Sequence, residues 1–161
     1  MRGYFGIGII NGKASVNLGT LWRSAHIFDA KFIFTVGKRY SYQASDTKKT
    51  WKSIPLVEFE DYRSFQNHMP RDSKLVFVEQ TTDAVLIERF KHPDQAVYLL
   101  GAEDRGIPSE ILRTDAYATI KIAGGDSLNV AVAGSIVMYD RYRQWVELDR
   151  DARLPTWEKS R

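Results

Sequence analysis

Apolar runs and segments of helical spacing alternate along the chain. Short runs typical of buried strands occupy 4–10, 31–36, 56–59, 74–79, 96–100 and 117–122. Between them, apolar residues recur at helical spacing in 17–28, 61–69 and 84–90, and again from about 126 to 148. Strands separated by helices of this length predict an α/β fold, with a mostly parallel sheet covered by helices on both faces.

Residues suited to helix ends stand before two of these helices. Ser15 is the expected cap of the helix 17–28. The last helix is expected to begin at Asp126 or Ser127, where cap residues precede the apolar spacing. Small residues dominate the first turns of that last helix, so another backbone can approach it closely.

The composition is that of an ordinary globular protein. Of the 161 residues, 43% are hydrophobic and 27% charged, and the absence of cysteine excludes disulfides and fits a reducing, cytoplasmic location. Because no apolar run reaches bilayer length and glycines interrupt the apolar start, neither a membrane span nor a signal peptide is expected.

The sequence shows neither repeats nor linkers. We therefore interpret 1–150 as one domain and 151–161 as a C-terminal tail. No metal site is expected, since the histidines are scattered at His26, His68 and His92.

Basic residues concentrate in one long loop, 37–53. It holds a single carboxylate against five cationic side chains, while the whole chain has a net charge of +3. Aromatic residues are interleaved with these cations. Cations for phosphates and flat rings for unstacked bases suit single-stranded nucleic acid, so the loop is interpreted as an RNA-binding surface, with a merely solvated loop as the alternative. The cationic residues are Lys38, Arg39, Lys48, Lys49 and Lys52.

Two of the expected strands end in glycine-containing loops. The run 96–100 stops at Gly101, which opens the sequence GAEDRGIP, and the run 117–122 is followed by Gly124 and Gly125. Open α/β sheets bind ligands at such strand ends, because backbone groups are uncovered there and glycine lets a ligand come close. The sequence therefore predicts a ligand site at these two loops.

Polar residues able to take part in chemistry stand at strand ends or helix starts. Taken singly, each has a structural explanation: Asn17 and Ser127 suit helix caps, Arg23 a surface position and Glu103 a loop. Asn129 follows Ser127 at the start of the last helix. Their arrangement in three short motifs carries more information than any one residue.

These motifs together resemble those of the SpoU (TrmH-like) family of the SPOUT class, S-adenosylmethionine-dependent RNA ribose 2′-O-methyltransferases. The family motif N-x-G/A-x-x-x-R is matched by Asn17, Gly19 and Arg23. The motif G-x-E-x-x-G-x-P is matched by Gly101, Glu103, Gly106 and Pro108. The motif S-L/M-N-x-x-x-A is matched by Ser127, Leu128, Asn129 and Ala133. All three stand in the family's order, and the resemblance covers about residues 4 to 146.

The resemblance implies features that periodicity does not show. Family members form a deep trefoil knot in their C-terminal part and pair as homodimers through their first and last helices. Their glycine loops enclose S-adenosylmethionine, which implies backbone contacts at Gly101, Ile122 and Leu128, with Ser127 beside them. Val78, at the end of a neighbouring strand, is a further candidate for contact with the cofactor.

The same resemblance implies roles in methyl transfer. Arg23 matches the family's catalytic arginine, but a guanidinium stays protonated in proteins. We therefore expect Arg23 to clamp an RNA phosphate, while that phosphate or a nearby acceptor takes the proton of the 2′-hydroxyl. Asn17 and Glu103 would fix the arginine and the loop, and Ser127 with Asn129 would shape the cofactor pocket and the place of the ribose.

By analogy of size, the expected RNA is tRNA and the expected position is its anticodon wobble nucleotide, because the chain is similar in size to the minimal family members with that substrate. The alternatives are an rRNA 2′-O-methyltransferase, a knotted base methyltransferase and a non-catalytic RNA-binding module. An NAD-dependent enzyme is disfavoured, since no G-x-G-x-x-G sequence follows the first strand.

Overall fold

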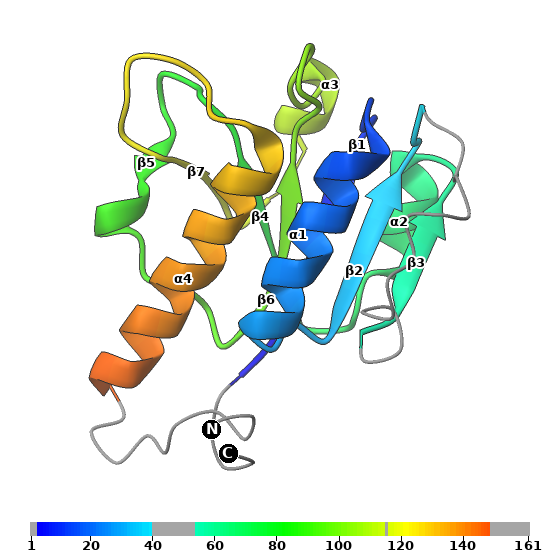
Figure 1. Cartoon of the computed structure of the whole chain (residues 1–161). Helices are drawn as coiled ribbons and strands as arrows, with labels where there is room; N and C mark the ends of the chain where they lie inside the picture. The colour runs from blue at the N-terminus through cyan, green and yellow to red at the C-terminus, as the bar shows by residue number, and fades with distance from the viewer. Residues whose placement is uncertain (1–2, 40–53, 115, 149–161) are drawn as a thin grey trace.

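The structure is a computed structural model that describes residues 3–39, 54–114 and 116–148 (Figure 1). Two sequence-based predictions lie outside the described residues: the C-terminal tail 151–161, and the part of the basic loop that carries Lys48, Lys49 and Lys52.

Seven strands form one sheet, and all the strand pairs described are parallel. The strands are β1 (Tyr4–Ile10), β2 (Phe32–Val36), β3 (Leu56–Phe59), β4 (Lys74–Val78), β5 (Val85–Leu86), β6 (Gln95–Leu100) and β7 (Ala118–Lys121). Their order across the sheet is β3-β2-β1-β6-β4-β7-β5, so β6 lies between β1 and β4. The predicted α/β class with a mostly parallel sheet is confirmed.

Helices cover both faces of this sheet. They are α1 (Ser15–Ile27), α2 (Tyr62–His68), α3 (Ser109–Leu112) and α4 (Val130–Leu148), with a 3-10 turn, η3 (Ile87–Arg89). Helices α1 and α4 lie side by side on one face, and α2 and α3 lie on the other (Figure 1). Within the described residues, none of the helices combines the length and apolar character that crossing a membrane requires.

Two apolar cores fill the space between the sheet and these two helical layers. On the face of α1 and α4, Ile7 of β1 packs in one cluster with Leu21 and Val137, and all three are buried. On the opposite face, the ring of Phe34 in β2 stacks on Phe65 of α2, with ring centroids 4.9 Å apart. Burial on both faces is what a parallel sheet requires, and it explains the nearly continuous apolar runs of the central strands.

Two predicted helix starts are wrong. The last helix begins at Val130, because the side-chain oxygen of Asn129 accepts from the backbone N–H groups of Ala131 (2.9 Å) and Val132 (3.3 Å). Asn129 therefore acts as the cap that the sequence suggested for Ser127, and the preceding residues extend along the loop after β7. In α1, Ser15 is the first helical residue, and Ala14 precedes it without a side-chain hydrogen bond.

The predicted helix at 84–90 is also wrong. This segment forms the short strand β5, paired with β7, followed by the 3-10 turn η3. The apolar spacing that suggested a helix instead places Ile87 and Phe90 in the core under α4. The four-residue helix α3, which follows GAEDRGIP, has too few residues to show helical periodicity in the sequence.

Candidate active site

The carboxyl ends of β4, β6 and β7 meet the start of α4 around a cavity of about 460 Å³. The loop 101–107 after β6 and the loop 122–129 after β7 form two of its walls. All the residues that the sequence suggested for cofactor contact line it: Val78, Gly101, Ile122, Ser127 and Leu128. This is the edge of an open parallel sheet at which ligands bind, because strand ends leave backbone groups uncovered.

The loop 101–107 folds tightly back on itself. Ala102 and Gly106 form an antiparallel bridge, in which the Gly106 N–H donates to the Ala102 carbonyl at 2.9 Å. Gly106 has a φ of +63°, a conformation that glycine adopts at little cost. The turn projects Glu103 and Asp104 toward the segment between β1 and α1.

Polar residues from all three motifs join in one chain of hydrogen bonds. The amide nitrogen of Asn17 donates to Glu103 Oε1, and the amide nitrogen of Asn129 donates to Asn17 Oδ1 at 3.0 Å. The backbone N–H of Lys13 donates to Glu103 Oε2 at 3.1 Å. Residues separated by 86 and 112 positions in the sequence thus meet at one side of the cavity.

Glu103 is held as a carboxylate by these contacts. Partial burial raises the pKa of its carboxyl, but hydrogen bonds from its own backbone, from Asn17 and from the backbone of Lys13 and Ala14 lower the pKa by more. The net pKa lies below the ordinary value for a glutamate. At neutral pH the side chain is therefore an acceptor, suited to orienting Asn17 and unsuited to donating a proton.

Arg23 lies apart from this hydrogen-bonded chain. It is exposed on α1, and it has no hydrogen-bond or ion-pair partner among the described residues. It does not line the cavity, whereas Glu103 and Ser127 do. The structure thus brings Asn17, Glu103 and Asn129 together and leaves the guanidinium of Arg23 available to a ligand from solvent.

Both described residues of the predicted RNA-binding set pair with carboxylates. Lys38 forms an ion pair with Glu58 of β3. Arg39 makes a fork to Asp104, with Nη2–Oδ1 at 2.5 Å and Nη1–Oδ2 at 3.2 Å, and its Nε donates to the Asn11 carbonyl at 2.7 Å. The hydrogen bond from Arg39 lowers the pKa of the Asp104 carboxyl to about 2. Arg39 therefore ties the start of the basic loop to the loop 101–107.

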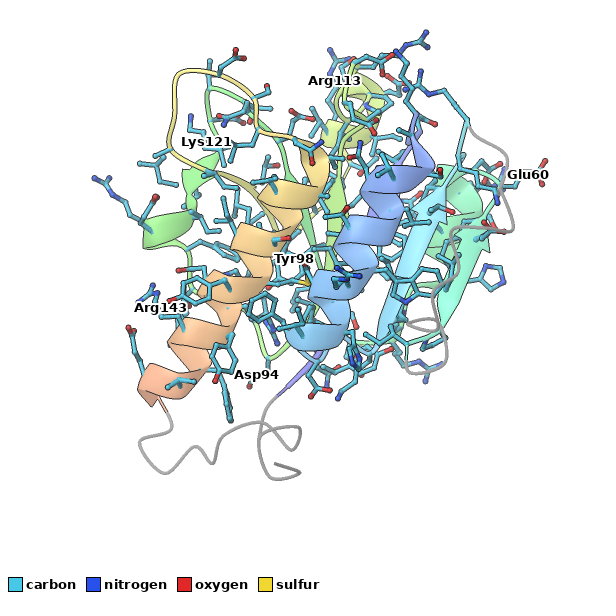
Figure 2. All side chains as sticks on the ribbon, viewed as in Figure 1. Glu60, Asp94, Tyr98, Arg113, Lys121 and Arg143 are labelled. Atoms are coloured by element: carbon cyan, nitrogen blue, oxygen red, sulfur yellow. The ribbon has the colours of Figure 1, made fainter. Side chains whose placement is uncertain are left out.

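Sequence reasoning missed the polar residues that follow β4. Glu79 and Gln80 line the cavity and bond to the two loops on either side. Lys121, at the end of β7, also lines the cavity and donates to the Thr81 carbonyl at 2.8 Å; Figure 2 shows it beside the loop that follows β7. A polar pair directly after a buried strand was the available signal, because that position lies at the ligand-binding edge of a parallel sheet.

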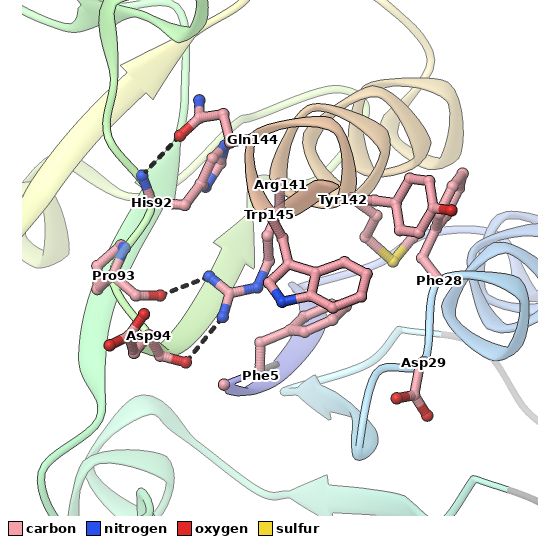
Figure 3. Close-up of a pocket in the computed structure, with 12 residues that line it drawn as sticks. Phe5, Phe28, Asp29, His92, Pro93, Asp94, Arg141, Tyr142, Gln144 and Trp145 are labelled. Carbon is pink, nitrogen blue, oxygen red and sulfur yellow. Dashed lines mark hydrogen bonds between the residues drawn. The ribbon is translucent and has the colours of Figure 1, made fainter. Parts of the chain in front are cut away.

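A much smaller cavity, of about 60 Å³, lies at the opposite edge of the sheet (Figure 3). Arg141 of α4 points into this region and is buried. It donates to the carbonyls of Pro93 (2.5 Å) and Asp94 (2.8 Å) and to the Tyr98 hydroxyl (3.2 Å). These bonds attach the second half of α4 to the start of β6, which is a structural role.

No group of three or more metal-binding side chains occurs within the described ranges. His92 contacts Tyr98 and Asp140 in the small cavity's polar wall, while His26 and His68 are exposed on other elements. The large cavity instead offers backbone groups, apolar side chains and carboxylates, a set suited to an organic ligand.

Comparison with known proteins identifies related chains. A mouse protein named tRNA (guanosine(18)-2′-O)-methyltransferase TARBP1 (Mus musculus) is 28% identical over 138 residues, which is 80% of this chain and 9% of that protein. This chain therefore spans only a small part of that relative.

Solved structures share the fold. A structure that addresses the 2-OH methylation of C/U34 on tRNA superposes with a TM-score of 0.80 at 21% identity, covering 91% of this chain and 99% of the other. The SpoU methyltransferase AviRb from Streptomyces viridochromogenes, in complex with the cofactor AdoMet, has a TM-score of 0.78 at 22% identity, covering 91% and 62%.

The sequence model of the SpoU rRNA Methylase family matches residues 7–139, a span that contains all three motifs and every strand from the middle of β1 to β7. The cavity and the chain of hydrogen bonds beside it lie within the same span. With most of its length matched, this chain belongs to the SpoU rRNA Methylase family.

Proposed function

We propose that this chain is an S-adenosylmethionine-dependent RNA methyltransferase that transfers a methyl group to a ribose 2′-hydroxyl, with tRNA as its favoured substrate. The observation that carries the proposal is the hydrogen-bonded chain Glu103–Asn17–Asn129 beside the large cavity. Membership of the SpoU family supports it. Two of the similar proteins are described by the 2′-O or 2-OH methylation of tRNA, which supports tRNA over rRNA.

The large cavity fits S-adenosylmethionine in size and chemistry. Its volume lies within the range of about 300–1,000 Å³ that is typical of small-molecule sites. Val78, Ile122 and Leu128 supply apolar surface for an adenine ring, and the adjoining loops expose backbone groups. Glu103 supplies negative charge near a cationic ligand, whereas the charge of Asp104 is offset by Arg39. When bound, the cofactor supplies an activated methyl on a sulfonium with a good leaving group.

The protein's own residues then have to position the RNA and help its hydroxyl lose a proton. Arg23 is exposed and has no carboxylate partner among the described residues, which supports a role in clamping a phosphate through its planar fork. That phosphate, or an acceptor near it, takes the proton. Glu103 accepts from Asn17, and Asn17 accepts from Asn129, so these bonds join the starts of both helices beside the place of the ribose.

Exposed cations stand at the same edge as the cavity and suit an RNA backbone. Lys13 and Arg105 lie beside Asp104, each with its cationic nitrogen 4.0 Å from a carboxylate oxygen. Arg113 stands nearby, next to α3 (Figure 2). Lys38 and Arg39 belong to the proposed RNA surface too, but their carboxylate partners reduce the charge that they present.

The trefoil knot and the homodimer are parts of the same proposal. Family membership supports a knot in the C-terminal part, where the loops 101–107 and 122–129 lie against one cavity. Exposed apolar side chains on α1 and α4 support the dimer. On α4, Val132, Tyr139 and Val146 recur at seven-residue intervals and so share one exposed face. A second copy would bury this face in a closed two-fold pair.

The dimer is tested by light scattering. We expect twice the mass of one chain, and we expect Tyr139→Glu to give a single-chain mass because it places a charge on the apolar face. Val85→Glu, on an exposed apolar residue of β5, is the matched control and should leave the dimer intact. A single-chain mass for the unsubstituted protein would contradict the dimer.

Nucleoside analysis of a deletion strain tests the activity. We expect tRNA from the strain to lose one 2′-O-methylated nucleoside, and we expect the unsubstituted chain to restore it while the Arg23→Ala chain does not. Loss of a ring-methylated nucleoside instead would favour a base methyltransferase with the same fold. Unchanged tRNA together with a lost rRNA modification would move the substrate to rRNA.

A further inference from the structure

The segment after β4 leaves the sheet between the two loops of the large cavity. Because β4 lies between β6 and β7, the residues that follow it stand between the loop 101–107 and the loop 122–129. Residues 79–81 are neither helix nor strand, and they carry the sequence Glu-Gln-Thr. Their side chains are therefore placed to reach both loops.

Glu79 is hydrogen-bonded to the loop 101–107. Its Oε2 accepts the backbone N–H of Ile107 at 2.7 Å, and its Oε1 accepts the backbone N–H of Gln80 at 3.0 Å. A Cβ atom added at Gly101 or Gly106 would lie 2.6 Å or 2.5 Å from Glu79 Oε2. The carboxylate thus lies against both motif glycines. At Gly101 the backbone of Gly106 also approaches to 2.5 Å, so neither position has room for a side chain.

Gln80 holds the loop on the other side. Its Nε2 donates to the Ile122 carbonyl at 2.9 Å, at the point where the chain leaves β7. The contact is reinforced from the opposite direction, because Lys121 Nζ donates to the Thr81 carbonyl at 2.8 Å. Residues 79–81 are thus bonded to both cavity walls, and these bonds form without the ligand.

We propose that Glu79 and Gln80 are positioning residues that hold the two loops in their cofactor-binding shape, with Glu79 setting the loop 101–107 and Gln80 setting the loop 122–129. This inference rests on the proposed function, since the ligand is taken to be S-adenosylmethionine. Ordering a loop on binding costs free energy and lowers affinity. Loops that are already held in the bound shape avoid this cost. Loss of either bond therefore weakens cofactor binding while the chemistry at the RNA is unchanged.

Calorimetry with S-adenosylmethionine tests the inference on the full chain. Glu79→Gln keeps the shape of the side chain but turns one acceptor into a donor, which opposes one of the two N–H groups. We expect its Kd to rise about 10- to 100-fold, as loss of one hydrogen bond to a charged group implies. We expect Gln80→Ala to raise the Kd by about 3- to 10-fold, because the bond it loses is neutral.

A control separates positioning from general damage. Glu88→Ala removes an exposed carboxylate of η3, away from the cavity, and should leave the Kd unchanged. In assays with RNA, the KM for the cofactor should rise in Glu79→Gln while kcat at saturating cofactor and the KM for RNA stay within about twofold. Amide hydrogen exchange should become faster at Ile107 and Gln80 in this variant, whereas exchange along β6 stays slow.

The outcomes distinguish this inference from the proposed function. If the unsubstituted chain does not bind S-adenosylmethionine, the proposed function fails. If it binds, and Glu79→Gln and Gln80→Ala bind with the same Kd, then the two residues do not position the loops and the inference is overturned. A fall in kcat with an unchanged cofactor KM would overturn it as well.

Discussion

Both ends of the Asn17 side chain are used in the active-site chain of hydrogen bonds. Its amide nitrogen donates to Glu103, and its oxygen accepts from Asn129. Asn129 in turn uses its oxygen to cap α4. Each side chain therefore fixes the next, from the loop after β6 through α1 to the start of α4, so one substitution disturbs three elements.

Asn17→Asp tests this chain with an isosteric change. The new carboxylate keeps the acceptor for Asn129 but faces Glu103 with like charge and without a donor. We expect kcat/KM for RNA methylation to fall about 10- to 100-fold, the effect of losing a hydrogen bond to a charged group.

Glu103→Gln in the same chain provides the rescue. The amide at 103 can donate to the carboxylate at 17 while its oxygen still accepts from the Lys13 backbone N–H. The double variant should therefore recover part of the activity lost in Asn17→Asp, and a double-mutant cycle measures the coupling. Additive losses in the cycle would show that the two side chains do not act together.

At this scale, the sequence placed the polar residues in separate motifs but did not show how they meet. Asn17, Glu103 and Asn129 stood in separate motifs, and their joining required the sheet order to be known. The polar residues Glu79 and Gln80 carried no recognised motif, so their contacts to the loops were visible only in the structure. The pairing of Arg39 with Asp104 depended on a fold-level contact across 65 positions.

Close approach of α1 and α4 sets the geometry of the active site, because Asn17 and Asn129 stand at the starts of these helices. The hydroxyls of Ser24 and Ser135 are 2.7 Å apart at the crossing. A Cβ atom added at Gly134 would lie 2.3 Å from Leu21 Cδ1. Small residues in α4 are therefore required by packing against α1, as the sequence suggested.

Gly134→Ala tests the packing of these two helices. Since Leu21 is fully buried and has little room to move, we expect the substitution to reduce the free energy of unfolding by about 1–3 kcal/mol in urea denaturation. Gly19→Ala is the matched control on α1, because nothing lies within 4 Å of the added Cβ. It should raise the free energy of unfolding by up to about 1 kcal/mol, the difference in helix propensity. If Gly134→Ala did not destabilise the protein relative to Gly19→Ala, the packing account would be contradicted.

Element boundaries show where sequence reasoning fell short. Six of the seven described strands were predicted to within one residue at each end, because their apolar runs reflect burial. The exception is β5, in a segment predicted to be a helix. The start of α4 was placed too early, since Asp126 and Ser127 resemble caps but lie in the loop along the cavity. Asn129 takes the role of the cap instead, and it alone of these residues combines a local cap bond with a tertiary bond to Asn17 among the bonds described.

A buried polar cluster joins α4 to the sheet at the edge opposite the active site. His92 bonds to the Tyr98 hydroxyl at 2.6 Å and to Asp140 at 3.1 Å, and Arg141 and Arg143 lie on the same helix. Burial lowers the pKa of His92 to about 4, although Asp140 opposes the shift. The imidazole is therefore neutral in the folded protein at neutral pH.

The stability of the whole molecule should depend on pH through His92. Because its folded pKa lies below the unfolded value of about 6.5, the folded state binds fewer protons, and stability is lost as pH falls from 6.5 toward 4. Between pH 7.5 and pH 5 we expect this group to remove about 2 kcal/mol from the free energy of unfolding. Urea denaturation at the two pH values measures the change.

Two histidine variants isolate this contribution. His92→Gln should flatten the pH dependence, because the titrating group is gone. His26→Gln, at an exposed position on α1, should leave the dependence as it is. An equal slope in the unsubstituted protein and in His92→Gln would show that other groups control the acid response.

The central claim concerns the whole molecule: two helices and three strand ends form one site that methylates a ribose. Its most direct test is mass spectrometry of nucleosides from tRNA incubated with the purified chain and S-adenosylmethionine that carries a deuterated methyl group. We expect a labelled nucleoside whose base fragment is unlabelled, because the methyl is on the sugar, and we expect no labelled nucleoside with Arg23→Ala. Label in the base fragment, or no label in tRNA or rRNA although the cofactor binds, would contradict the account.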